Sequence, residues 1–151
     1  EGELSYPTID KFINYDQLTL ETIKPHLNAF TAKQVTTFQT LLKKLIRLIS
    51  YPQSGDFYHD AIYTYQTPVV KNNQAFVVMD VVFEEEDLEM TLEYHWQKNA
   101  DNDWQLVDLS FDEDSLVKDY QNQFARIITK EGTSGLIKRL KDKVIEIEKA
   151  S

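Results

Sequence analysis

The stretch that decides the fold is Leu88–Trp96, with the sequence LEMTLEYHW, in which large apolar residues alternate with polar ones. Successive side chains of a β-strand point to opposite faces, so a period of two predicts a strand with one buried and one wet face. Leu92, Tyr94 and Trp96 lie on the buried face, and His95 lies on the wet one. The stretch therefore predicts a central strand of an antiparallel sheet.

The same period continues on both sides of this stretch. We expect four strands near 57–67, 74–84, 87–97 and 103–111. The connections between them are short and rich in Asn, Asp and Glu, which favours sequential hairpins. A sheet built as an antiparallel meander follows.

Before the sheet the apolar residues recur with the 3.6-residue period of helices. Two short helices are expected at about Thr8–Tyr15 and Gln17–His26. A longer helix should begin at Thr31, where Thr31 and Gln34 have the spacing of a capping box, and run to about Ile49. Ser50-Tyr51-Pro52 should end it, because the residue before a proline disfavours helical backbone.

After the sheet two more helices are expected. Asp112 or Asp114 is positioned to cap the first, Gly132 to stop it, and Thr133 or Ser134 to begin the second. The order of elements predicts an α+β fold, a four-stranded antiparallel curved sheet covered on one face by the N-terminal and C-terminal helices. We expect one domain over 1–151, with helices at about 8–49, strands at about 57–111 and helices at about 114–148.

The chain is strongly acidic, with a formal net charge of −9. This charge argues against nucleic-acid binding and against stable residence on anionic lipid. The acidic residues are concentrated between Asp80 and Asp114, which hold thirteen Asp or Glu and one Lys. Such a run is typical of a solvated face, and a docking face for a basic partner is the alternative.

Motifs for chemistry are scarce. The absence of cysteine excludes disulfides and thiolate metal sites, and the three histidines are too scattered to suggest a zinc site. Asp80, His95 and Asp108 lie in the middle of predicted strands, and a catalytic role would require one of them to face a pocket. Asp108 is the candidate that the alternation leaves open.

Apolar and aromatic side chains are abundant, with eight Tyr, eight Phe and two Trp. A solid core explains most of them. Two features favour a cavity: the helix from Thr31 to Ile49 has a wide apolar arc, and Tyr94, Trp96 and Tyr120 offer polar tips at the edge of an apolar volume.

The last third of the chain resembles the MlaC family. The resemblance is carried by Trp104-Gln-Leu-Val-Asp108, by Asp114-Ser-Leu-Val117, by Tyr120-Gln-Asn-Gln-Phe124, and by Lys130-Glu-Gly132 followed by Gly135-Leu-Ile137 and Leu140. Members of this family are periplasmic phospholipid carriers that serve an ABC system moving lipid between the outer and inner membranes. The chain departs from the family pattern at Glu113-Asp114 and at Tyr120-Gln121.

The resemblance implies a phospholipid as bound cargo, no other cofactor, no catalytic residue and no metal. It implies transient partners, namely the substrate-binding subunit of an inner-membrane ABC transporter and an outer-membrane lipoprotein complex, without stable insertion in the membrane. It also implies a periplasmic location with an export signal removed.

We expect the acyl chains to lie between the helices and the buried face of the sheet. Val107 and Leu109 are chosen over their neighbours as the inward residues of the last strand. The expected lining is Phe38, Leu41, Leu42, Leu45, Ile49, Val77, Met79, Val81, Leu92, Tyr94, Trp96, Val107, Leu109, Tyr120, Phe124 and Ile128. The alternatives are an enzyme or binding module of the nuclear-transport-factor-like kind, acting on a small hydrophobic ligand through Asp108 or His95, and a protein-interaction module that uses the acidic strand region.

Overall fold

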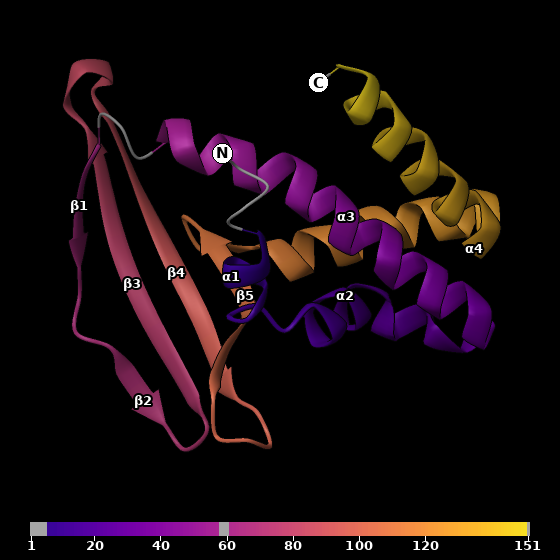
Figure 1. Ribbon diagram of the computed structural model, residues 1–151, viewed down its shortest axis with the longest axis horizontal. Helices are drawn as coiled ribbons and strands as arrows, with labels where there is room; N and C mark the ends of the chain where they lie inside the picture. The colour runs from indigo at the N-terminus through magenta and orange to yellow at the C-terminus, as the bar shows by residue number, and fades with distance from the viewer. Residues whose placement is uncertain (1–5, 58–60, 151) are drawn as a thin grey trace.

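The computed structural model of the chain describes residues 6–57 and 61–150. An antiparallel sheet stands at one end of the molecule, and the helices extend from one side of it (Figure 1). The predicted α+β class is therefore confirmed. The sheet has six strands where four were predicted.

The N-terminal region forms α1 (Tyr6–Asp10), α2 (Tyr15–Ile23) and the 3-10 helix η2 (Lys24–Ala29). Both helices begin two residues earlier than predicted. For α2 the reason is a cap: the side-chain oxygen of Asn14 accepts a hydrogen bond from the backbone N–H of Gln17 at 3.1 Å.

The long helix α3 (Ala32–Phe57) starts where the capping box predicts. The Gln34 N–H donates to Thr31 Oγ1 at 3.1 Å, and the Thr31 N–H donates to Gln34 Oε1 at 2.9 Å. The predicted end at Pro52 is wrong, because α3 continues through it. A proline removes one helical hydrogen bond at a cost of about 3 kcal/mol, which the packed turns before it outweigh.

The sheet is an antiparallel meander extended at both edges. Its order is β1-β3-β4-β5-β6, and β2 also pairs with β3. The strands are β1 (Ile62–Tyr65), β2 (Val69–Lys71), β3 (Gln74–Phe83), β4 (Leu88–Lys98), β5 (Trp104–Phe111) and β6 (Asp114–Ser115), with the 3-10 turn η3 (Glu84–Glu86) between β3 and β4. The three predicted strands that start at 74, 87 and 103 are confirmed to within a residue.

The first predicted strand is the least accurate. Residue 57 belongs to α3, residues 58–60 lie outside the described residues, and β1 covers only Ile62–Tyr65. Pro68 follows, and β2 then pairs with the other end of β3. Proline has no N–H to donate to a ladder, so the edge is divided into two short strands.

The turns between strands are where the sequence places them. Asn72, Asp87 and Asn102 have positive φ values of 55°, 50° and 69°. Asn and Asp tolerate the left-handed region better than other non-glycine residues, which is why the hairpins reverse at these positions.

The helix α4 (Leu116–Ala150) begins differently from the prediction. Asp108 Oδ1 accepts from the Val117 N–H at 3.2 Å, and Ser115 Oγ accepts from the Lys118 N–H at 3.1 Å. Asp112 instead accepts from the Thr91 N–H at 2.7 Å, and Asp114 belongs to β6. The predicted cap was wrong because the chain first reverses at Asp112, whose φ is +46°.

Gly132 interrupts α4 with φ +74° and ψ −179°. The predicted stop is confirmed, and the chain changes direction between the orange and yellow halves of α4 (Figure 1). A side chain is strongly disfavoured at this combination of angles, so glycine is required.

Candidate functional site

The side chains that the structure describes form two groups of buried apolar residues. The helical cluster joins α2, α3 and α4 around Phe38, Leu42, Phe124, Leu136 and Leu140. The sheet cluster is smaller and is built on Met79, Val81 and Leu92 of β3 and β4. The chain thus has two apolar regions where one continuous core would be the simplest outcome.

The predicted helical lining lies in the helical cluster. Phe38, Leu42, Leu45 and Phe124 are buried members, with Phe38 and Leu42 completely shielded from solvent. The Phe38 ring packs edge-on against Phe124, with centroids 5.5 Å apart. The partly buried residues packed against the cluster include Leu41, Ile49, Tyr120 and Ile128.

The predicted strand lining lies largely in the sheet cluster. Met79, Val81 and Leu92 are buried there, and Tyr94 and Leu109 pack against them. Met79 is paired with Leu92, and Val77 with Tyr94, so these side chains share one face of the sheet, here called the inner face. Met79 and Val81 have no exposed surface, and the helices lie on one side of the sheet (Figure 1), so the inner face is the covered one.

A β-bulge determines which residues of β5 face inward. The register of β4 against β5 shifts between His95 and Trp96. Leu109 is paired with Tyr94 and therefore lies on the inner face. Val107 is buried at the bulge. Three residues of the predicted lining, Val77, Trp96 and Val107, belong to neither cluster.

The helices and the sheet are joined mainly through β5. The helix α3 packs against α2 and α4, and α2 and α4 in turn contact β5. Within the described residues, contacts of α3 with β3 and β4 are sparse. Among the described residues, the predicted lining is therefore divided between two apolar groups that are linked chiefly through β5.

An apolar rim surrounds the sheet cluster and was missed by the sequence reasoning as part of a site. Each rim residue is paired across the sheet with a residue of the inner face. On the β1 and β2 edge, Tyr63 is paired with Val81, Tyr65 with Met79 and Val70 with Ala75. On β4 and β5, Leu88 is paired with Phe83 and Phe111 with Leu92. All five rim residues, Tyr63, Tyr65, Val70, Leu88 and Phe111, therefore share the inner face, and each is at least 40% exposed. Their register against β3 and β4 identifies them, and the register could not be read from the sequence.

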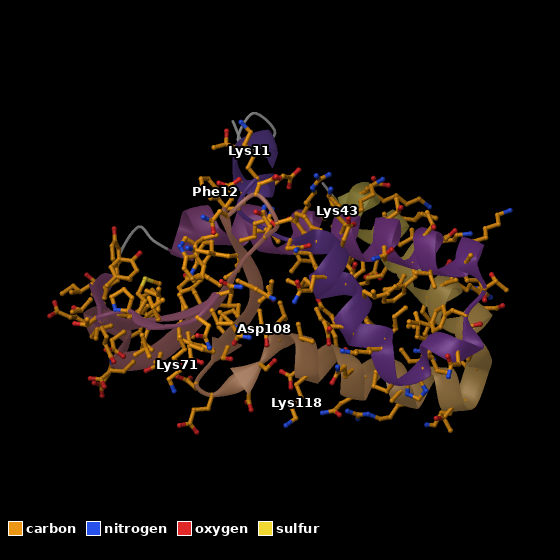
Figure 2. All side chains as sticks on the ribbon, turned by 90° about the horizontal axis from the view of Figure 1, so that it is seen from below. Lys11, Phe12, Lys43, Lys71, Asp108 and Lys118 are labelled. Carbon is orange, nitrogen blue, oxygen red and sulfur yellow. The ribbon has the colours of Figure 1, made fainter. Side chains whose placement is uncertain are left out.

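Asp108 has a structural role that accounts for its carboxylate. It accepts hydrogen bonds from the Leu109 N–H at 2.8 Å, the Val117 N–H at 3.2 Å and the Ser115 hydroxyl at 2.5 Å. Figure 2 shows Asp108 between the sheet and the start of α4. The side chain ties β5 to α4.

His95 lies opposite Asp108 in the register, on the face away from Tyr94. Its ring stacks on the Phe76 ring, with centroids 4.5 Å apart, and its Nε2 is 3.3 Å from Gln74 Oε1. Neither His95 nor Asp108 projects from the inner face, so the enzyme hypothesis loses its two candidate groups. In the described part of the chain, no group of His, Asp or Glu is arranged to hold a metal ion.

Tyr120 is a polar tip of the predicted lining, and its titration is shifted. Its ring stacks on Phe124, with centroids 5.2 Å apart. Burial raises the pKa of the Tyr120 hydroxyl, because desolvation disfavours the phenolate. The hydroxyl therefore stays protonated at neutral pH beside the helical cluster.

The sequence profile of the MlaC protein family matches residues 4–142. The chain belongs to the MlaC family. In three dimensions the chain is similar to a phospholipid-binding protein from Ralstonia solanacearum, solved in complex with a phospholipid. The TM-score is 0.80 at 20% sequence identity, and the match covers 97% of this chain and 81% of that one.

The comparison with curated protein sequences finds no significant match. The family and the structural similarity point to a binding protein rather than to an enzyme. Among the described helices, none is both long enough and apolar enough to cross a bilayer.

Proposed function

We propose that this MlaC-family chain binds a phospholipid and places its acyl chains between the inner face of the sheet and the helical cluster. The observation that carries the proposal is the division of the described apolar side chains into two clusters, with few contacts between the described part of α3 and the central strands. The phospholipid bound by the Ralstonia solanacearum protein of the same fold supports the choice of ligand.

The energetics favour such a ligand. Each CH₂ moved out of water contributes about 0.8 kcal/mol, so one acyl chain gains roughly 10 kcal/mol on entering an apolar slot. Met79 and Val81 are completely covered. The part of the helical layer that covers them must therefore move to admit the chains, and the sparse contacts of α3 with β3 and β4 among the described residues favour such a movement.

The exposed rim gives the ligand a place to enter. On the edge strand β1, the rings of Tyr63 and Tyr65 pack edge to face with centroids 6.4 Å apart. Both side chains are exposed to solvent. Exposed apolar side chains that continue a buried apolar face are typical of a ligand groove. We place the headgroup end of the phospholipid near this rim.

The finer role we propose is that of the family. The protein would shuttle phospholipid through the periplasm between the outer and inner membranes, as the soluble component of an ABC-type transport system. Its transient partners would be the substrate-binding subunit of the inner-membrane transporter and an outer-membrane lipoprotein complex. The membership of the chain in the MlaC family supports this role.

Native mass spectrometry of the protein mixed with phosphatidylglycerol vesicles tests the proposal. The wild-type chain should carry bound phospholipid, and Leu92→Lys, which places a charge in the sheet cluster, should not. Val78→Lys is the matched control: it places the same charge on the opposite face of β3, where Val78 is paired with Glu93, and should load normally. Loading of Leu92→Lys equal to that of the wild type would contradict the proposed site.

A further inference from the structure

An open groove lies at the end of the helical layer farthest from the sheet, where α3 begins and α4 bends (Figure 1). Its volume is about 380 Å³. One wall comes from the first turns of α3 and the other from the second half of α4. The lining residues are Thr31, Lys33, Gln34, Thr37, Ser134, Ile137, Lys138 and Lys141. We call this feature the basic groove.

The basic groove carries positive charge on a chain whose net charge is −9. Lys33 stands on the α3 wall, and Lys138 and Lys141 stand on the α4 wall. Lys138 is paired with Asp142 at 2.6 Å. Within residues 6–57 and 61–150, the ammonium groups of Lys33 and Lys141 have no ion-pair or hydrogen-bond partner.

The two walls are fixed to each other. The Gln34 side-chain amide donates to Thr133 Oγ1 at 3.1 Å and to Ser134 Oγ at 3.4 Å. The same Gln34 closes the capping box of α3. Ile137, 8% exposed, forms an apolar floor between the walls. A docking segment would therefore meet a preformed groove, which reduces the entropy lost on binding.

We propose that the basic groove docks an extended acidic segment of a partner protein. Unpaired lysines on opposite walls match carboxylates that alternate along an extended chain, and the floor accepts an apolar side chain between them. An anionic bilayer fits the groove less well, because the acidic remainder of the chain is repelled by a negative surface. The groove lies away from the inner face, so docking leaves the proposed lipid site free.

A charge-reversal pair with a matched control tests this docking. The groove variant is K33E/K141E, and the control is K71E/K118E, which reverses two exposed lysines near the sheet and the start of α4 (Figure 2). Binding of a fluorescent peptide of alternating Glu and Ser is measured by anisotropy at low and high salt. The groove variant should weaken binding by about tenfold or more, and the control by less than about twofold.

The location of binding is read from backbone amide shifts of the full chain titrated with the same peptide. Shifts should concentrate at residues 31–37 and 134–141 and diminish at high salt. Absence of peptide binding, equal binding by both variants, or shifts centred on the sheet would overturn the proposal. So would groove-dependent binding to phosphatidylglycerol vesicles without peptide binding, which would assign the groove to a membrane surface.

Two checks keep this result separate from the proposed function. Thermal unfolding of the groove variant should match that of the control, and K33Q/K141Q should weaken peptide binding without the added negative charge. Phospholipid loading by native mass spectrometry should be the same in all these variants, so a failure of docking and a failure of lipid binding are distinguishable.

Discussion

The helical cluster and the sheet cluster differ in how much of their apolar surface is buried. The helical cluster draws residues from three helices, and aromatic rings pack edge-on within it. The sheet cluster has three buried members, and large apolar side chains at its margin remain exposed. One region is a closed core, whereas the other leaves apolar surface exposed, which the proposed lipid site would use.

The largest effect should come from breaking the helical cluster. Phe38→Ala removes a completely buried ring. The centroid of this ring lies 5.9 Å from that of Phe30 and 5.5 Å from that of Phe124. We expect the free energy of unfolding to fall by about 3–5 kcal/mol, because a large cavity is left between three helices. Urea unfolding measures this. A loss below about 1 kcal/mol would show that the cluster is loosely packed.

A smaller effect should come from loosening the junction between the two regions. Asp108→Asn leaves the Ser115 hydroxyl and the Val117 N–H with a weaker acceptor, so we expect a loss of about 1–2 kcal/mol in thermal unfolding. Asp114→Asn is the control, since Asp114 lies in β6 and is exposed. If Asp114→Asn were the more damaging change, the cap would have been assigned to the wrong residue.

The helical cluster should also respond to alkaline pH through Tyr120. Its pKa is raised by burial in the folded chain, so the unfolded chain loses the phenolic proton first as the pH rises. Stability is therefore full below the ordinary tyrosine pKa of about 10 and decreases as the pH rises through the folded value. Unfolding experiments on Tyr120→Phe should show a shallower alkaline decrease than the wild type. Identical profiles would remove Tyr120 as the cause.

The smallest effect on stability should come from the apolar rim. Tyr65 is 61% exposed, so Tyr65→Ser should change the free energy of unfolding by no more than about 0.5 kcal/mol. The same variant should take up phospholipid less completely, because the rim continues the inner face. Thr64→Ala, on the opposite face of β1, is the control and should load normally. A stability loss without any loading defect would make the rim part of the core.

The sequence predicted the parts of the fold that depend on local rules. Strict alternation placed β4, the capping box placed the start of α3, and Gly132 placed the break in α4. The errors arose where tertiary contacts outweigh local rules. The helix α3 passes through Pro52, and the start of α4 is capped by Ser115 together with Asp108, which lies on the preceding strand β5.

The burial of the predicted lining residues was predictable to the same extent, whereas their role as a lipid site stays a prediction. Alternation and helical period selected residues such as Met79 and Phe38, which the structure buries. The rim was missed because Tyr63 and Phe111 join the inner face only through strand register. The bulge between His95 and Trp96 cannot be read from one sequence, and it decides which side of β5 faces inward.

The most direct test of the central claim is photo-crosslinking with a phosphatidylglycerol that carries a diazirine at the end of one acyl chain. The claim predicts adducts, mapped by peptide mass spectrometry, on the inner face of β3 and β4 and on the facing part of α3. Adducts confined to the outer face of the sheet, for example at Val78 or Val82, or no adducts at all, would contradict it.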